Sequence, residues 1–290
     1  MGWKDVTPSD DVEAADWIPG RLNGFAENVG SVVPTGFEAY ARIFHPATTG
    51  AQHPGIDVRW SEVAAAAGRI VHPEMQFHAI ATPVPNRPAE PAQWDGLPKD
   101  GTLSARQLRA LVEILPAHTT TPNTCWMCLW EGYGYNTAVW LTAVASPPRR
   151  PGQMAWFRRL SIGSRKKNRG LPGRPDQNPP PHVDPEFRDR MSGPPRFAEL
   201  CEIAKRVSLP GRDYLLFKGT VTQAEGWGDG PNLWWPEDRM WCVASEIDFP
   251  YTYVGGSREL IEEILCHPAL EALPATLDQG INYASDGVNS

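Results

Sequence analysis

A chain of 290 residues is long enough to bury a substantial core, in one large domain or two smaller ones, because folding removes about three quarters of the extended surface at this length. Its 41% apolar and 21% charged residues are typical of a globular protein, and it lacks the run of about 18 apolar residues that a membrane helix needs. The net charge is −7. The N-terminal residues are acidic and lack the apolar centre of a secretion signal, so we expect a cytoplasmic, soluble protein.

The five cysteines do not form a disulfide framework of the secreted kind, because their number is odd and they are widely spread. Cys125 and Cys128 make a CxxC pair, which in redox proteins lies at a helix N-terminus and in zinc ribbons occurs twice. Here the pair lies in an apolar run with high β propensity and has no second copy. This context favours thiols packed in the core over a redox pair or a zinc site.

Residues 1–33 are polar and acidic, are broken by prolines and glycines, and carry the isolated aromatic residues Trp3, Trp17 and Phe25. We predict an N-terminal arm here, extended and docked through its aromatic rings. A single α+β domain is expected to follow over residues 34–284, with a peripheral tail at 285–290.

Capping and turn signals locate the regular elements of this domain. Ser61 precedes a short helix that ends at Gly68, and Ser104 with Gln107 forms a capping box before a helix that Pro116 stops. Ser257 is a natural N-cap for a helix over 258–266. Helices are predicted at 62–67, 105–115, 197–207 and 258–266, strands near 58, 77, 125, 139, 214, 241 and 252, and either a short helix or the start of a strand at 37–44.

The fold class that these elements favour is α+β, with a single mixed or largely antiparallel sheet, flanking helices and a long insertion rich in proline and arginine. The strands at 214–221 and 240–247 are expected to form an antiparallel pair.

Several histidines in the first third of the chain could suggest a metal site. His72 and His78 are six residues apart, which places them on different faces of a helix, though on one face of a strand. We therefore expect surface or hydrogen-bonded core positions here, and the sequence predicts neither a metal site nor a cofactor.

The stretch 146–196 differs in composition from the rest of the chain, with eleven prolines and little periodicity. Between Arg149 and Arg174 it has nine basic residues and no acidic one, with a cluster at Arg165, Lys166, Lys167 and Arg169. Such a composition predicts a flexible basic insert. It could contact an acidic partner, nucleic acid or an anionic membrane surface, or it could be a solvated linker without a partner.

The segment 232–257 is the strongest candidate for positioning a site. Residues 240–247 are predicted to form a strand covered on both faces, because both alternating sets of side chains are largely apolar. That strand would deliver Glu246 and Asp248 to its end, and with His118 these form a candidate acid/base group. The alternative for Glu246 is a structural role, either in an ion pair with Arg239 or as a solvated carboxylate at the end of the strand.

Aromatic and charged residues near the predicted strand ends are the candidates for ligand binding. Trp234 and Trp235 are adjacent and point opposite ways in an extended chain, so one of them could cover a pocket. The predicted ligand-binding residues are Trp234, Trp235, Glu131, Tyr133, Asp238 and Arg239.

The blocks GFEAYARIFHPA, VRWSEVAAAAGR, HTTTPNTCWMCLWEGYG and WWPEDRMWCVASEID with TYVGGS occur in this order along the chain. In them the chain resembles a group of uncharacterised actinobacterial proteins, over roughly residues 34–145 and 210–284. The resemblance implies no activity, so function is inferred from the residues themselves.

Two functions are compatible with these patterns. The first is a binding or regulatory module, with an aromatic and acidic groove and a basic loop, which the lack of a nucleophile elbow, phosphate loop or metal triad favours. The alternative is an acid/base or hydrolase-like enzyme that uses the carboxylates with His118.

Overall fold

The computed structural model describes residues 6–50, 55–85, 94–133, 200–227 and 230–289. The chain divides into two compact units, one of residues 1–132 and 203–290 and one of residues 133–202. Every strand of the main sheet belongs to the first unit. The predicted strand near 139 and the basic insert with Arg165, Lys166, Lys167 and Arg169 lie outside the described residues.

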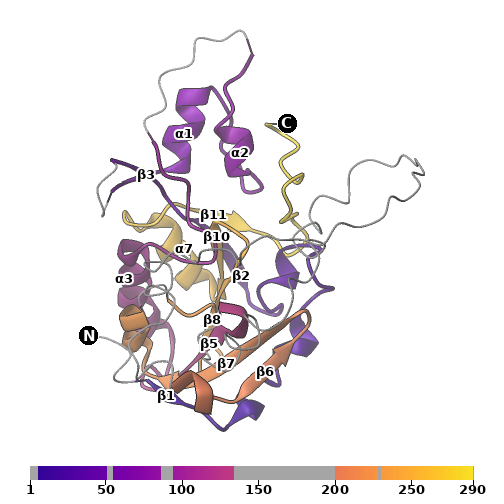
Figure 1. Cartoon of the computed structure of the whole chain (residues 1–290), viewed down its shortest axis with the longest axis vertical. Helices are drawn as coiled ribbons and strands as arrows, with labels where there is room; N and C mark the ends of the chain where they lie inside the picture. Colours follow the sequence, from indigo (N-terminus) through magenta and orange to yellow (C-terminus); the bar gives the residue numbers. More distant parts are fainter. Residues whose placement is uncertain (1–5, 51–54, 86–93, 134–199, 228–229, 290) are drawn as a thin grey trace, which may run out of the picture. The chain divides into compact units, whose positions relative to one another are not determined.

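The main sheet is antiparallel throughout (Figure 1). In spatial order its strands are β1 (Thr7–Pro8), β7 (Arg212–Gly219), β5 (Cys125–Trp130), β8 (Leu233–Pro236), β9 (Cys242–Ser245), β10 (Tyr251–Gly256), β2 (Ala39–Phe44) and β11 (Ala272–Ala275), with β6 (Arg206–Leu209) beside β1 on β7. A second sheet pairs β3 (Ala47–Thr49) with β4 (Ile56–Val58). The predicted α+β class with a largely antiparallel sheet is confirmed.

The helices of the described residues are short. The α-helices are α1 (Trp60–Ala67), α2 (Phe77–Ile80), α3 (Ala105–Ile114) and α7 (Arg258–Cys266). Residues 200–203 are also helical, in the region predicted as a helix at 197–207. The 3-10 turns are η2 (Val12–Ala15), η3 (Pro19–Arg21), η4 (Val29–Ser31), η5 (Leu115–His118), η6 (Glu131–Tyr133) and η7 (Val221–Trp227). Ser104 and Ser257 cap α3 and α7 by accepting the backbone N–H groups of Gln107 and Leu260, as predicted. No helix in these ranges is long and apolar enough to cross a membrane.

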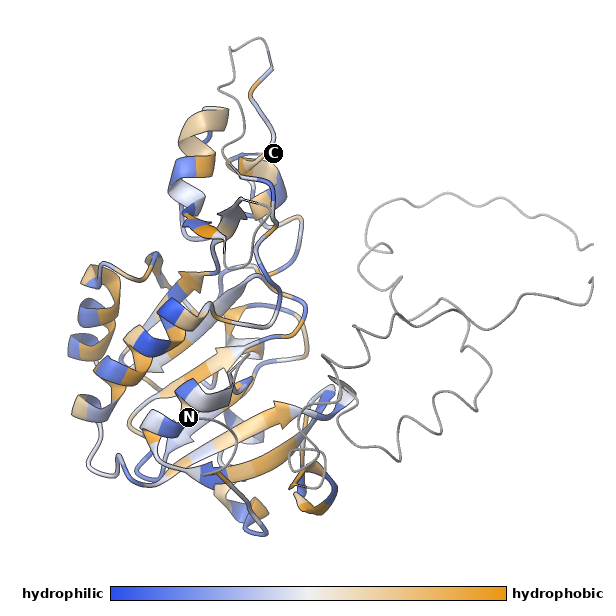
Figure 2. Cartoon of the chain, turned by 60° about the vertical axis from the view of Figure 1, so that its left-hand side comes forward, coloured by the Kyte–Doolittle hydropathy of each residue, from blue (hydrophilic) through white to orange (hydrophobic). Residues whose placement is uncertain are grey.

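Strand β9 lies in the interior, with both faces covered. Cys242 and Ala244 belong to the core cluster that includes Trp235, whereas Trp241 on the other face donates its indole N–H to the carbonyl oxygen of Leu115 at the end of α3. In Figure 2, α3 and α7 show mixed polar and apolar residues while the strands beside them are mainly apolar. The prediction that 240–247 runs through the interior is confirmed for its central residues.

The N-terminal residues form part of the core. Residues 6–33 fold into β1 and three 3-10 turns, and Ala15, Ile18, Val29 and Val33 are buried against the sheet. The predicted extended conformation is therefore limited to β1. These aliphatic residues are buried, whereas Trp17 is partly buried, Phe25 is 38% exposed and Trp3 lies outside the described residues.

Some predicted elements differ from the structure. Residues 77–80 are helical, because Phe77 and Ile80 are buried at helical spacing, and residues 206–207 belong to β6, which pairs with β7. Strand β7 does not pair with β9, because β5 and β8 lie between them. Helix α1 begins at Trp60, one residue before the predicted cap Ser61.

Strands β8 and β11 were not predicted, and β2 is the second of the two alternatives, a short helix or the start of a strand, expected at 37–44. In β2, five of six residues are buried, so the strand shows no alternation of polar and apolar residues. Both β8 and β11 contain a proline, a residue that in the sequence alone indicates a turn.

Candidate functional site

Glu246 and Asp248 are held by one arginine, Arg212, at the start of β7. Arg212 Nη2 lies 2.8 Å from Glu246 Oε1 and 3.0 Å from Asp248 Oδ2, and its Nε lies 3.1 Å from the same Glu246 oxygen. The side chains of Arg212 and Glu246 are 19% and 13% exposed. The sequence suggested Arg239 as the partner of Glu246, and the structure shows Arg212 instead.

A small cavity adjoins this ion pair. Its wall includes Arg212, Tyr214, Asn232, Ser245 and Glu246, with residues of the N-terminal segment on the far side. The volume within which the centre of a water molecule can lie is about 30 Å³. By the same measure, a single water molecule needs roughly 10–15 Å³. The cavity therefore has room for one or two water molecules and is too small for a substrate.

Burial raises the pKa of Glu246, although Arg212 opposes that shift. Next to this cluster, Gly101 donates its backbone N–H to the carbonyl of Phe249, which brings Asp100 near Asp248. Partial burial and the charge of Asp248 raise the pKa of Asp100 to about 6. Asp100 is an exposed residue, so water screens this effect, whereas the side chain of Glu246 is only 13% exposed. No motif in the sequence pointed to Asp100.

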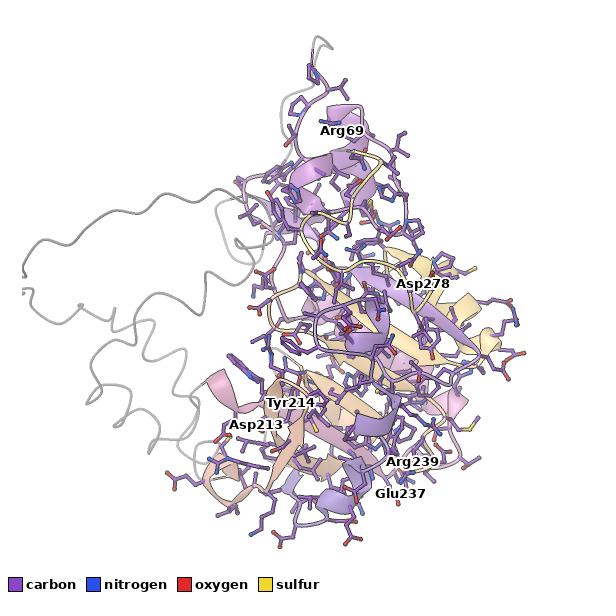
Figure 3. All side chains as sticks on the ribbon, turned by 90° about the vertical axis from the view of Figure 1, so that its right-hand side faces the viewer. Arg69, Asp213, Tyr214, Glu237, Arg239 and Asp278 are labelled. Carbon is purple, nitrogen blue, oxygen red and sulfur yellow. The ribbon has the colours of Figure 1, made fainter. Side chains whose placement is uncertain are left out.

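His118 is not part of this cluster. Its Nε2 lies 2.7 Å from Glu263 Oε2 on α7, and the next residues, Thr119 and Thr120, bind Asp238 just beyond the end of β8. Glu246 lies at the opposite end of β8, which pairs antiparallel with β9. The four residues of β8 span about 13 Å at roughly 3.3 Å per residue. In Figure 3, Tyr214 beside the cavity is well separated from Glu237 and Arg239 at the other strand end.

Each predicted ligand-binding residue within the described side chains has a contact inside the protein. Trp234 and Trp235 are both fully buried and pack edge-on against Trp241 and Trp17, so neither covers a pocket. Asp238 accepts hydrogen bonds from Thr119 and Thr120, the guanidinium of Arg239 lies 5.7 Å from the Trp17 ring, and Glu131 pairs with Arg206. The side chain of Tyr133 lies outside the described part.

A network of hydrogen-bonded side chains begins at Ser245, the residue before Glu246. Ser245 Oγ lies 2.7 Å from Thr252 Oγ1, which lies 2.8 Å from His45 Nε2, and His45 Nδ1 lies 2.6 Å from the carbonyl oxygen of Lys99. Burial lowers the pKa of His45 to about 4. The imidazole is therefore neutral at pH 7. These hydrogen bonds form a structural network that joins β9, β10 and the 99–101 loop.

A wider concave surface than this cavity is a groove between α7 and β11, which we call the α7/β11 groove. Its volume is about 450 Å³. Ile261 and Leu265 of α7 face Pro274, Ala275 and Leu277 across it. Its polar lining residues are Glu38, Arg258, Glu262 and Thr276. This surface was not predicted from the sequence, because β11 was not recognised as a strand.

Metal and thiol chemistry find little support in the described geometry. Nowhere in those ranges do three or more histidine, cysteine, aspartate or glutamate side chains form a group that could hold a metal ion. All five cysteines are free, and burial raises the pKa of Cys125 and Cys128, which disfavours the reactive thiolate.

Comparison with known proteins returns no match: no family model, no curated protein and no solved structure is significantly similar to the chain.

Proposed function

We propose that this protein is a binding module and that the α7/β11 groove is its ligand site. The observation that carries the proposal is the groove itself, whose volume of about 450 Å³ lies within the roughly 300–1,000 Å³ of small-molecule sites. Its aliphatic side chains come from two elements that the sheet and the cap of α7 hold in place, so the surface is built on rigid parts of the fold.

The contacts of the acidic residues favour binding over acid/base catalysis. Glu246 and Asp248 share Arg212, Asp238 is held by threonines, and Trp126 donates its indole N–H to Glu237 at 2.6 Å. These interactions are typical of a structural role. The cavity beside Arg212 and Glu246 is also too small for a substrate.

The polar residues of the groove indicate the chemistry of its ligand. Arg258 faces two carboxylates, Glu38 and Glu262, so the polar lining carries no excess positive charge to attract an anion. The ligand that fits is a largely apolar molecule, neutral or weakly cationic.

A neutral fluorescent probe, N-phenyl-1-naphthylamine, tests this site. The dye should bind the native protein with increased fluorescence, and Leu265→Glu should weaken binding at least tenfold by placing a charge in the apolar floor. The matched control is Met240→Glu, which changes a 50% exposed apolar side chain outside the groove and should leave dye binding unchanged. Equal binding by the Leu265→Glu protein would show that the groove is not the ligand site.

In the same binding module, we propose that the basic stretch 149–174 contacts an anionic partner. Its support is the sequence, where nine cationic residues occur without an acidic one. Retention on a heparin column at low salt should decrease when Arg165, Lys166, Lys167 and Arg169 are changed to serine. Unchanged retention would contradict the role. The five free cysteines support the expectation that this binding occurs in a reducing cytoplasm.

The raised pKa values of Glu246 and Asp100 favour one second candidate, acid/base catalysis at the Arg212 cluster without His118. In a screen of nitrophenyl esters and glycosides, a turnover that Glu246→Gln abolishes and His118→Gln leaves unchanged would support it. Turnover equal in the wild type and Glu246→Gln would exclude that role for Glu246.

A further inference from the structure

Arg42, at the centre of β2, is a buried cation without an anionic partner. It is 1% exposed, and its guanidinium is charged at any pH a protein tolerates. Among the described residues no carboxylate lies within ion-pair distance of it. Arginine is almost never buried in this way unless it is paired.

The partners that Arg42 does have account for only part of its hydrogen-bonding capacity. Nη1 donates to the carbonyl oxygen of Pro73 at 2.5 Å, and the guanidinium carbon lies 3.7 Å from the ring centre of Tyr251 and 4.8 Å from that of Phe44. These aromatic faces stabilise the charge. Nε and Nη2 are buried and make no hydrogen bond to the described residues, although the guanidinium is close enough to the Tyr251 hydroxyl to oppose the rise in pKa that burial causes there.

A third unpartnered donor lies beside them. Tyr253 of β10 stands directly opposite Arg42 in the pairing of β10 with β2, so their side chains leave the sheet on the same face as close neighbours. Its hydroxyl is also buried without a partner within the described residues. Burial raises the pKa of this hydroxyl, so it stays protonated and is able to donate.

Three buried, unpartnered donors on neighbouring side chains, with a net positive charge, match an anion better than a water molecule. One water accepts at most two hydrogen bonds, whereas a spherical anion accepts from all three groups and also balances the charge of Arg42. Besides Arg42, the charged groups that act on Tyr253 and Tyr251 are the carboxylates Glu74 and Asp100, and neither forms an ion pair with Arg42 within the described residues. The neutral His45 adds no charge.

We propose that Arg42 and Tyr253 bind a small monovalent anion of the halide class inside the folded protein. The C-terminal residues close over this region, because Tyr251 beside Arg42 donates its hydroxyl to the carbonyl oxygen of Ile281 at 2.6 Å. The anion therefore enters as the chain folds or when this segment opens, and it contributes to the stability of the native state.

The first test is crystallographic. Crystals of the full chain grown in sodium bromide should show an anomalous bromide peak within hydrogen-bond distance of Arg42 and Tyr253. A water molecule at that position, or no density there, would overturn the proposal.

The second test is thermal unfolding in chloride and in gluconate at equal ionic strength. The wild-type melting temperature should be higher in chloride, and Tyr253→Phe, which keeps the ring and removes the donor, should weaken the apparent chloride affinity at least tenfold. The matched control is Tyr40→Phe, since the Tyr40 hydroxyl donates to Pro34 and not to the proposed site. Tyr40→Phe should keep the chloride effect, and the same dependence in Tyr253→Phe would contradict the proposed site.

Discussion

At the scale of single residues, Glu246 shows why a carboxylate at a strand end need not be catalytic. Its alternation along β9 was readable from the sequence, and it does lie at the buried end of that strand. Its partner was not readable, because Arg212 is 34 residues earlier in the chain and is brought near only by the packing of the strands. A sequence pattern thus located the buried acid, whereas the tertiary fold decided its role.

Replacing Arg212 by methionine should destabilise the protein by about 2 kcal/mol at pH 7, because Glu246 would remain buried without its cation. The pKa of Glu246 is already raised in the folded state, and loss of Arg212 should raise it further. A group with a raised folded pKa costs no stability once the pH is low enough to protonate both states. The loss should therefore shrink as the pH falls through the raised pKa of the folded state, and it should be gone below about 4.5, near the ordinary pKa of glutamate. Urea unfolding at pH 7 and pH 4 measures the difference.

The matched control is Arg109→Met, which breaks an ion pair with Glu225 whose side chains are 62% and 43% exposed. Exposed pairs contribute roughly 0–1 kcal/mol, so this variant should stay close to the wild type at both pH values. Equal losses in the two variants would show that the burial of Glu246 is not the cause.

At the scale of elements, helix α1 depends on a residue far along the chain. Glu271 accepts the backbone N–H groups of Trp60 and Ser61 at 2.6 and 2.7 Å, so both carboxylate oxygens cap the start of this helix. The sequence predicted the helix from a local serine, and the actual cap comes from the segment before β11. Local capping signals were sufficient for α3 and α7, where Ser104 and Ser257 act as predicted.

Glu271→Ala should therefore lower the free energy of unfolding by about 1 kcal/mol, the usual contribution of a helix cap. Hydrogen exchange at the first amides of α1 should accelerate in this variant, while α3 keeps its protection. Glu113→Ala, which removes an exposed carboxylate from α3, is the control and should change stability by less than about 0.5 kcal/mol. Unchanged exchange in α1 would refute the capping role.

The C-terminal segment is a second element fixed by a distant contact. Asp286 accepts the backbone N–H groups of Gln76 and Asn289, and His72 Nε2 lies 2.8 Å from its Oδ1. Burial alone would raise the pKa of Asp286, but the backbone N–H groups of Asn289 and Gln76 lower it below the usual value. Residues 285–289 are therefore attached to the loop before α2, whereas the sequence suggested a peripheral tail.

Asp286→Ala should detach this segment, with faster proteolysis at the C-terminus and lost amide protection at Gln76. In the wild type, a lowered folded pKa means that the stabilisation is present at neutral pH and is lost as the pH falls through that pKa, so detachment should also occur in acid. The control is Asp278→Ala, because Asp278 bonds only within its own turn in the described contacts. Equal protection in both variants at pH 7 would contradict the role of Asp286.

At the scale of the whole molecule, the class of fold was predictable but the order of the strands was not. Buried strands such as β5 and β9 have long apolar runs, and the caps of α3 and α7 are local, so these elements were found. The pairing depends on contacts between distant segments, for example Ala41 in β2 with Val254 in β10. The α7/β11 groove and the Arg42 site arise from that pairing, so the sequence could not indicate them.

The edges of the main sheet contain prolines where pairing with another chain would begin. Phe44 donates its backbone N–H to the backbone carbonyl oxygen of Glu271, so the backbone groups of Glu271 point towards β2. Because this direction alternates along a strand, the backbone groups of Leu273 and Ala275 also point towards β2. The backbone groups of Ala272 and Pro274 then face outward, and Pro274 has no N–H to donate. At the other edge, β1 is two residues long and includes Pro8, and β6 beside it is four residues long and has no proline. Natural sheets limit edge-to-edge association in this way.

Pro274→Thr should restore an outward N–H and a β-branched side chain, and so promote association of β11 with a second copy of the chain. Analytical ultracentrifugation over a range of concentrations should show more self-association for this variant than for the wild type. Adding Ala272→Pro removes the other outward donor of β11 and should reverse the effect. If Pro274→Thr sediments like the wild type at every concentration, then the short length of β11 and its neighbours, and not the missing donor, protects this edge.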